Sequence, residues 1–344
     1  MNGTKISGIG TYIHSVVSNN DYINIFGKKA RFIDKKIPHK TRYSAINILD
    51  GSVEIRNSEM AYHASIEAME MAKVKNDEID MIIYSTSTPD YILPPNYVIL
   101  QEKLGIKKCM GIDIRSGCSG FGNAIITAKQ YIATGMAKKI LVVGADLTSS
   151  RLSFLFKNLK EFPLKALYNL MLFGDAAGAV VVEKSEIDNF FGTIMGSSRP
   201  NSPFGSLIEV GGSVNPYPNG NFKNEDIPIH QNALATEQLI PGVMIEAVEE
   251  FLGKSNSKIE DFNYYILPID SPRMASKVIE YFNLDSDKII SVGAEGGSLV
   301  NAAVPLALKK AYDLGKLKKG NKIMIYAAEN TRWQYAVMGY NCNF

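Results

Sequence analysis

The sequence contains few of the residues that usually bind metals or form disulfides. Its 344 residues include three cysteines, Cys109, Cys118 and Cys342, and four histidines spread along the chain. An odd number of cysteines without a Cys-x-x-Cys pair is not the pattern of a disulfide framework or of a thiolate zinc site. We therefore expect neither a disulfide framework nor a bound metal.

A strong net charge and long apolar runs are also lacking. The formal charge is +2 at pH 7, which implies no general attraction to nucleic acid or membrane surfaces. The apolar runs stop well short of the ~20 residues that a membrane span needs, and the first residues lack a signal-peptide pattern. We expect a soluble, cytoplasmic protein. Its length, with 46% hydrophobic residues, predicts a large core in two domains or two fused halves.

Cys118 lies in the segment with the clearest chemical signal. Residues 110–114 are predicted to form a short buried strand, and residues 122–132 carry apolar side chains at helical spacing after a glycine-rich turn. A thiol at such a junction lies near the unpaired N–H groups and the positive end of the helix dipole, which favour the thiolate. Free cysteines are more often inert core residues, but the glycines around Cys118 favour a nucleophile. The spacing of this turn matches neither a dinucleotide-binding nor a phosphate-binding loop.

The chain contains an internal repeat. Cys118 and Ser298 each lie 17 positions before a glycine. In both segments a helical pattern ends at that glycine and is followed by basic residues and an apolar strand. We therefore predict two similar α/β halves, residues 1–184 with the nucleophilic cysteine and residues 185–344.

The repeat predicts where a site should form. If the halves pack about a pseudo-twofold axis, the helices that follow Cys118 and Ser298 begin next to each other at the centre. Ligands in such sheets bind beyond the carboxyl ends of the strands. The predicted site therefore combines these two residues with the strand ends at residues 268–271 and 328–330.

Five segments carry the motifs of a known family: residues 85–94, 113–122, 172–179, 242–251 and 304–308. Together they spread over nearly the whole chain and resemble the thiolase-fold condensing enzymes, most closely β-ketoacyl-acyl carrier protein synthase III. The resemblance implies a thiolase-like α/β fold with α-β-α-β-α layers, a dimer, and a role in fatty-acid or polyketide biosynthesis. It also implies an acyltransferase whose Cys118 accepts an acyl group from a coenzyme A or acyl carrier protein thioester, without a permanently bound cofactor.

The sequence departs from the family pattern at the helpers of the second step. In the family, a malonyl group is decarboxylated and the carbanion attacks the acyl thioester, while a histidine and an asparagine hydrogen-bond the malonyl thioester carbonyl. Ile269 and Ser298 occupy the aligned positions. Isoleucine donates no hydrogen bond, and the loss of one such donor typically costs ~10²–10³ in rate. The glycine-rich turn before the last strand is also replaced, by residues 328–332.

Four residues are candidates to replace these helpers: Ser298, Asp270, His230 and Glu329. Histidine titrates near neutrality, but His230 precedes the expected position by one whole element. Asp270 has the alternative role of capping the helix that follows it, and Glu329 that of a surface carboxylate.

Three functions are compatible with these residues. The first is an acyltransferase that loads Cys118 and passes the acyl group to a carbon, oxygen or nitrogen nucleophile. The second is a decarboxylating synthase that uses substitute residues, and the third is a catalytically silent partner subunit of an active homologue. The retained Cys118 turn favours the first two, and the missing histidine favours the first and third. We therefore expect the first, with a thioester of coenzyme A or acyl carrier protein as partner and a homodimer or a heterodimer as the assembly.

Overall fold

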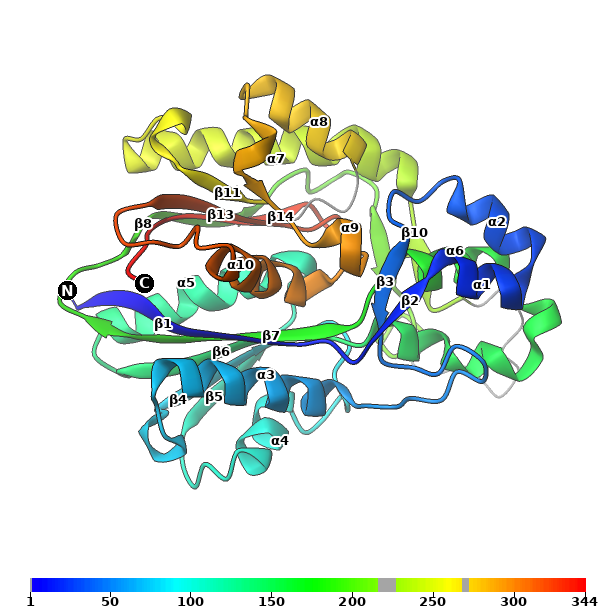
Figure 1. Ribbon diagram of the computed structural model, residues 1–344, viewed down its shortest axis with the longest axis horizontal. Coiled ribbons are helices and arrows are strands. Elements are labelled where there is room, and N and C mark those ends of the chain that lie inside the picture. Colours follow the sequence, from blue (N-terminus) through cyan, green and yellow to red (C-terminus); the bar gives the residue numbers. More distant parts are fainter. Residues whose placement is uncertain (1, 216–226, 268–271) are drawn as a thin grey trace.

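Two five-stranded sheets form the framework of the protein (Figure 1). The computed structural model describes residues 2–215, 227–267 and 272–344. The first sheet has the strand order β1-β7-β6-β4-β5. Its strands are β1 (Gly3–Tyr12), β4 (Met81–Ser85), β5 (Met110–Ile114), β6 (Lys139–Asp146) and β7 (Ala176–Ser185).

The second sheet repeats the topology of the first. Its order is β12-β11-β13-β14-β8. In both sheets three neighbouring strands run parallel to one another. The next strand pairs antiparallel with the third of them, and the last strand pairs antiparallel with that one. Its strands are β8 (Phe190–Ser197), β11 (Tyr264–Ile266), β12 (Ile289–Ile290), β13 (Lys322–Ala328) and β14 (Gln334–Asn341). The predicted two similar halves are confirmed in the fold, whereas the domain division into residues 1–184 and 185–344 stays a prediction.

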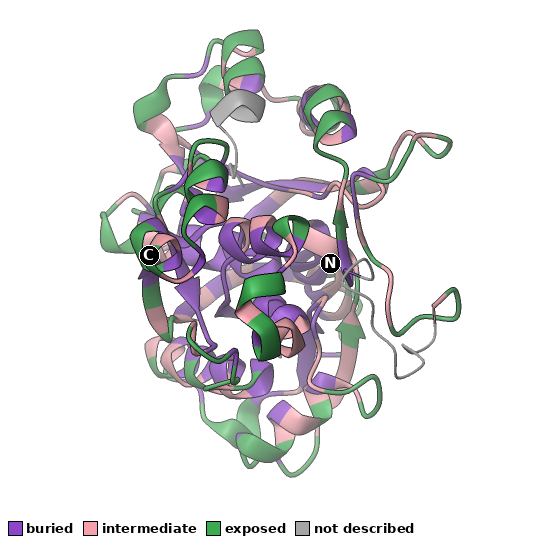
Figure 2. Cartoon of the chain, turned by 90° about the vertical axis from the view of Figure 1, so that its right-hand side faces the viewer, coloured by how far each residue is buried: buried purple, intermediate pink, exposed green. Residues whose placement is uncertain are grey.

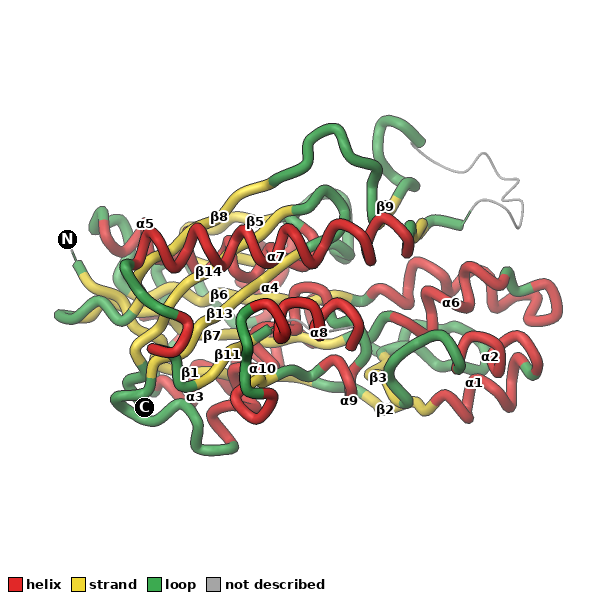
Figure 3. The backbone as a smooth tube through the Cα atoms, turned by 90° about the horizontal axis from the view of Figure 1, so that it is seen from above, coloured by secondary structure: helices red, strands yellow, loops and turns green. Residues whose placement is uncertain are grey.

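Helices cover both sheets and separate them, in the predicted α-β-α-β-α order (Figure 1, Figure 3). Each helical layer contains two main helices. They are α3 (Asn57–Ala72) and α4 (Asn96–Lys103) outside the first sheet, α5 (Gly120–Ala133) and α10 (Ala303–Asp313) between the sheets, and α7 (Ala233–Ser255) and α8 (Pro272–Tyr281) outside the second. In the described part of the chain, no helix has both the length and the apolar surface needed to cross a membrane.

The two central helices are buried between the sheets. Phe121 and Ile125 of α5 and Leu308 of α10 are fully buried in one apolar cluster that contacts both sheets. A helix that is covered on several sides is apolar around most of its circumference. Figure 2 shows buried residues concentrated in the sheets and the central helices, with exposed residues in the outer helices and loops.

A smaller helical lobe with its own core lies at one end of the sheets (Figure 1). The rings of Phe26, Phe156 and Phe162 pack edge to face there, with centroids 5.0–6.2 Å apart. The lobe contains α1 (Asn19–Phe26), α2 (Lys28–Asp34), α6 (Leu164–Leu172) and the 3₁₀ segment η3 (Thr148–Glu161). The strand pairs near it are β2 (Ser15–Ser18) with β3 (Thr41–Ser44), and β9 (Ser206–Ile208) with β10 (Ile229–Gln231).

Two local predictions differ from the structure. β5 has its predicted bounds but is only partly buried, because it is the edge strand of the first sheet as described. The second-half helix begins at Ala303 rather than after Ser298, since short turns come first. The short turns of the chain are α9 (Gly293–Gly296) and the 3₁₀ turns η1 (Asn76–Glu78), η2 (Gly117–Ser119), η4 (Ile259–Asp261), η5 (Ser286–Lys288) and η6 (Val300–Ala302).

β1 and α3 approach each other closely because two of the three glycines of β1, Gly8 and Gly10, face the helix. A Cβ built on Gly10 would lie 2.2 Å from the carbonyl oxygen of Ala64, and one built on Gly8 would lie 2.0 Å from that of Ala68. Real Cβ atoms essentially never come within 3.0 Å of another heavy atom. The helix therefore packs directly against the strand backbone. This contact fixes the position of α3 on the first sheet.

We predict that Gly10→Ala destabilises the protein by ~2–3 kcal/mol, because the added methyl group meets helix backbone that cannot rotate away. Gly253→Ala in α7 is the matched control, since a Cβ there has no neighbour within 4 Å and alanine stabilises a helix interior by ~0.5–1 kcal/mol. Urea unfolding of both variants measures the two free energies. A Gly10→Ala variant as stable as the wild type would contradict the close approach.

Candidate active site

Cys118 lies in the tight turn that connects β5 with α5, as predicted. It is the middle residue of η2, and α5 starts two residues later at Gly120. Gly117 has φ = +51°, which glycine adopts readily because it has no Cβ. Cys118 is half-buried beside the first turn of α5, at the end of the helix whose dipole favours negative charge. The turn therefore places the thiol at the position that the sequence predicted for it.

The Cys118 turn packs against the second half of the chain. η2 contacts η6, β13 and β14. A Cβ on Gly120 would lie 2.5 Å from Oδ1 of Asn301, and a Cβ on Gly117 would lie 2.8 Å from Oε2 of Glu329. The structure thus brings the Cys118 turn together with Glu329, which is a predicted component of the site, and with Asn301, which is not.

A buried polar network joins the two halves beside the start of α5. The side-chain amide and the backbone N–H of Asn301 donate to Oδ2 of Asp146 at 2.7 and 3.1 Å, and the hydroxyl of Ser85 donates to Oδ1 of Asn301 at 2.6 Å. Oδ1 of Asp146 accepts the N–H of Ser87 at 2.8 Å and the hydroxyl of Thr88 at 2.9 Å. Burial raises the pKa of Asp146, and the hydrogen bonds from Asn301 oppose that shift. The network fixes η6 relative to the ends of β4 and β6.

A residue with a strained backbone lies next to this network. Val300 has φ = +49°, which is unusual for a β-branched side chain and costs on the order of 1–3 kcal/mol. Its neighbour Asn301 makes the two hydrogen bonds to Asp146. These bonds offset the strain and keep the turn after Ser298 in one conformation.

Ser298 is buried, and its backbone pairs with the turn at the end of α6. The N–H of Ser298 donates to the carbonyl of Leu172 at 3.0 Å, and the N–H of Gly174 donates to the carbonyl of Ser298 at 2.9 Å. A Cβ on Gly174 would lie 1.9 Å from the carbonyl oxygen of Gly296, so only glycine fits without a backbone shift. The motif at residues 172–175 therefore fixes the position of Ser298.

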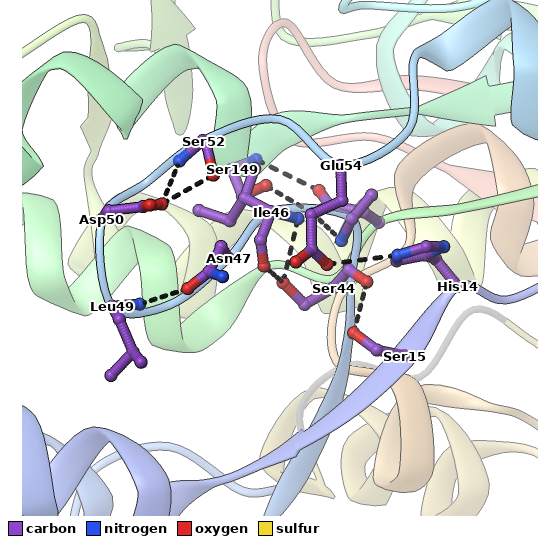
Figure 4. Close-up of polar contacts among 12 residues, drawn as sticks. His14, Ser15, Ser44, Ile46, Asn47, Leu49, Asp50, Ser52, Glu54 and Ser149 are labelled. Carbon is purple, nitrogen blue, oxygen red and sulfur yellow. Dashed lines mark hydrogen bonds and ion pairs between the residues drawn. The ribbon is translucent and has the colours of Figure 1, made fainter.

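Asp175 ties this motif to two more segments. Its carboxylate accepts the N–H groups of Ala45 and Ser149, both at 3.1 Å, and the hydroxyl of Ser149, while its own N–H donates to the carbonyl of Tyr43 at 3.0 Å. Figure 4 shows Ser149 beside the loop of residues 44–54 that follows β3. Burial raises the pKa of Asp175 to about 6.

Glu329 is buried, with 1% of its surface exposed, and follows directly after β13. Its carboxylate accepts the backbone N–H groups of Thr331, Arg332 and Gln334 within its own turn. The alternative of a surface carboxylate is therefore wrong, because the folded chain encloses this side chain between the turn and Gly117. Its catalytic role stays a prediction.

The other two candidate helpers stay predictions as well. His230 lies on β10 and is exposed, with its Nε2 2.8 Å from Oε2 of Glu209. Asp270 and Ile269 lie outside the described residues.

Sequence reasoning missed Asn301 and its partner Asp146. A signal existed, because Asn301 is a lone amide within an otherwise apolar run at residues 299–308. An unpaired buried amide costs ~1–3 kcal/mol, so such a residue indicates a buried polar partner. The identity of that partner depends on contact between the two halves, which the sequence pattern does not specify.

The chain is similar to known proteins over most of its length. Residues 112–198 match the family model of 3-oxoacyl-[acyl-carrier-protein] synthase III, and residues 252–330 match the model of its C-terminal part. A β-ketoacyl-[acyl-carrier-protein] synthase III of Clostridium perfringens (strain 13 / Type A) is 30% identical over 326 residues, covering 94% of this chain and 95% of the relative. The chain belongs to the β-ketoacyl-acyl carrier protein synthase III family. The family resemblance expected from the motifs is thereby confirmed.

Other comparisons agree with this assignment. The synthase III of Koribacter versatilis (strain Ellin345) is 27% identical over 326 residues, covering 94% of this chain and 93% of the relative. The synthase III structure from Aquifex aeolicus VF5 has a TM-score of 0.81 at 27% identity, covering 98% of this chain and 100% of that one. AbyA1, a tetronic acid condensing enzyme, shares the fold with a TM-score of 0.84 at 23% identity, covering 98% and 99% of the two chains. As a family member, the chain is a condensing or acyl-transferring enzyme of fatty-acid or polyketide pathways.

Metal ligands are not gathered at this site. Among residues 2–215, 227–267 and 272–344, no group of three or more His, Cys, Asp or Glu side chains is arranged to hold a metal ion.

We predict that Asn301→Ala destabilises the protein by ~2–4 kcal/mol, because Asp146 loses a donor and Ser85 an acceptor inside the core. Asn47→Ala is the matched control, since the side chain of Asn47 accepts a hydrogen bond from the N–H of Leu49 in an exposed turn, and we expect a cost below ~1 kcal/mol. Urea unfolding at neutral pH measures both. Equal costs at the two positions would contradict a special role for the network.

We predict a pH dependence of stability that arises from Asp175. Its pKa is about 6 in the folded protein against an ordinary value of 3.8, so folding favours the protonated form. This contribution is fully present below about pH 4 and is lost as the pH rises to about 6, by up to ~2–3 kcal/mol. The stability of Asp175→Asn relative to the wild type should therefore rise by that amount across this window in urea unfolding. A constant difference between the two proteins would contradict the raised pKa.

Proposed function

We propose that this chain is an acyltransferase that forms an acyl thioester on Cys118 and passes the acyl group to an acceptor in fatty-acid-like or polyketide metabolism. The donor is a thioester of coenzyme A or acyl carrier protein, without a permanently bound cofactor. The observation that carries this proposal is the position of Cys118 in η2, between the start of α5 and the wall formed by η6, β13 and β14.

The first step follows from the chemistry of the thiol. The Cys118 thiolate attacks the carbonyl carbon of the donor, and the tetrahedral intermediate expels the donor thiolate, which takes up the proton that Cys118 has lost. A thiolate is both a good nucleophile and a good acyl leaving group, so two moderate barriers replace one high barrier. The positive end of the α5 dipole favours the oxygen that becomes negative.

The second step is the transfer of the acyl group to the acceptor, with Cys118 as the leaving group. Three features favour direct transfer over decarboxylative condensation. Ser298 and Ile269 occupy the positions where the resembling enzymes carry asparagine and histidine. Glu329, whose buried carboxylate lies against Gly117, stands where the resembling enzymes have a glycine-rich turn.

We further propose that two copies of this chain form a homodimer. β5 is a partly buried edge strand in the described first sheet, which leaves its outer side for pairing with a second sheet. The nearby loop carries three exposed apolar side chains, Tyr91, Ile92 and Leu93, the last of which is 79% exposed. An edge strand next to exposed apolar residues is typical of a protein interface.

The test is intact mass spectrometry after incubation with a panel of acyl-coenzyme A and acyl carrier protein thioesters. We predict an acyl adduct on the wild type and on Cys109→Ala, and none on Cys118→Ala. Cys109 is the matched control because it is also half-buried, while burial raises its pKa and keeps the thiol protonated. Native mass spectrometry of the same samples gives the oligomeric state.

The outcomes separate the three functions. No adduct with any donor would contradict the acyl-enzyme proposal and favour the silent partner subunit. If an adduct forms, release of carbon dioxide after addition of malonyl carrier protein would favour the decarboxylating synthase. Loss of the acyl group to amine or alcohol acceptors without carbon dioxide would support direct transfer.

A further inference from the structure

Glu329 has an environment that the proposed acyl transfer does not yet explain. It is a buried acidic residue directly after β13, and its Oε2 lies against Gly117, the residue before Cys118. Burying a carboxylate is costly unless hydrogen bonds compensate for the lost water. The arrangement of those hydrogen bonds shows what this carboxylate does.

Both carboxylate oxygens of Glu329 are fully used within its own turn. Oε2 accepts the N–H of Thr331 at 2.6 Å and the hydroxyl of Thr331. Oε1 accepts the N–H of Arg332 at 2.9 Å and that of Gln334 at 3.1 Å. An ionised carboxylate offers about four lone-pair positions, so four hydrogen bonds occupy all of them. To accept a proton from a substrate, Glu329 would have to give up one of these bonds.

The turn that Glu329 closes is strained and carries large side chains. Trp333 is fully buried and has φ = +59°. This backbone angle costs on the order of 1–3 kcal/mol and persists only where the surroundings enforce it. Arg332 donates from its guanidinium to the carbonyl of Ser202 at 2.7 Å and lies over the ring of Phe204. The carboxylate therefore fixes the turn of residues 329–334. This turn contacts Gly117 on one side and residues 200–205 on the other.

We propose that Glu329 is a positioning residue, which fixes the turn of residues 329–334 against Gly117 and thereby sets the geometry of the Cys118 turn. It acts through the turn and not as the general base. This inference rests on the proposed acyl transfer for its kinetic readout. It assigns a role to the residue that stands where the resembling enzymes have a glycine-rich turn.

The test compares two variants that loosen the turn in different ways. Glu329→Gln keeps the shape but places an NH₂ group among N–H donors, and we expect acylation of Cys118 to fall ~10–100-fold, because small displacements of reacting groups have effects of this size. Thr331→Val removes one donor and no charge, and we expect a fall of ~3–10-fold. Single-turnover mass spectrometry at several pH values measures both, and each pH profile should keep the wild-type shape. Glu183→Gln, on β7 in an ion pair with Lys5, is the matched control without effect.

Three results would overturn the proposal. Wild-type acylation rates in Glu329→Gln would exclude a positioning role. A changed shape of the pH profile in Glu329→Gln, together with an unaffected Thr331→Val, would identify a base. If Glu329→Gln does not fold, as judged by its thermal melt, Thr331→Val decides: reduced acylation at a native melting temperature supports the proposal, and wild-type acylation contradicts it.

A second readout separates this inference from the acyl-transfer proposal. Iodoacetamide alkylates Cys118 without any acyl donor, and Cys109 in the same chain serves as the internal reference. If no acyl donor labels the wild type, the acyl-transfer proposal fails. The positioning role is then read from the alkylation rate of Cys118 relative to Cys109, which should still change in both variants and stay unchanged in Glu183→Gln.

Discussion

The hydrogen bonds between Asp146 and Asn301 join the two halves of the chain beside the catalytic turn. Asp146 ends β6 of the first sheet, and Asn301 lies in η6 of the second half, so each residue needs the other half for its buried polar groups. A buried carboxylate that lost this amide would keep fewer compensating donors in a medium of low dielectric constant, and the contact between the halves would weaken. The two halves are therefore held in one relative position, and the Cys118 turn is built where they meet.

Around this contact, the site consists of turns that are held by hydrogen bonds from backbone groups to buried polar groups. The motif at residues 172–175 holds Ser298 through its backbone, and Asp175 connects that motif to the loop after β3. Glu329 closes the turn after β13 with four hydrogen bonds. Positive φ angles at Val300 and Trp333 mark the two strained points of this framework. Such strain is kept where surrounding contacts over-determine the backbone, which is typical of functional sites.

The chemistry depends on the balance of donors and charges around Cys118. In the function that we propose, the dipole of α5 favours negative charge at the Cys118 thiol. The sequence has Ile269 and Ser298 where the resembling enzymes have histidine and asparagine, and these residues stabilise a carbanion less well. A thioester that reacts with a neutral nucleophile needs less of that stabilisation. The direct acyl transfer that we propose therefore demands less of this site than decarboxylative condensation would.

The sequence by itself determined the fold and the position of Cys118 in its turn. The matching spacing after Cys118 and Ser298 predicted two similar halves, and apolar periodicity with glycines at turns predicted the strand, the turn and the helix around Cys118, because these are local properties of backbone and side chains. The partly buried β5, the late start of α10 and the pairing of Asn301 with Asp146 were decided only by tertiary structure. So was the burial of Glu329, since a carboxylate becomes enclosed only when a distant turn packs over it, and no local pattern records which turn that is.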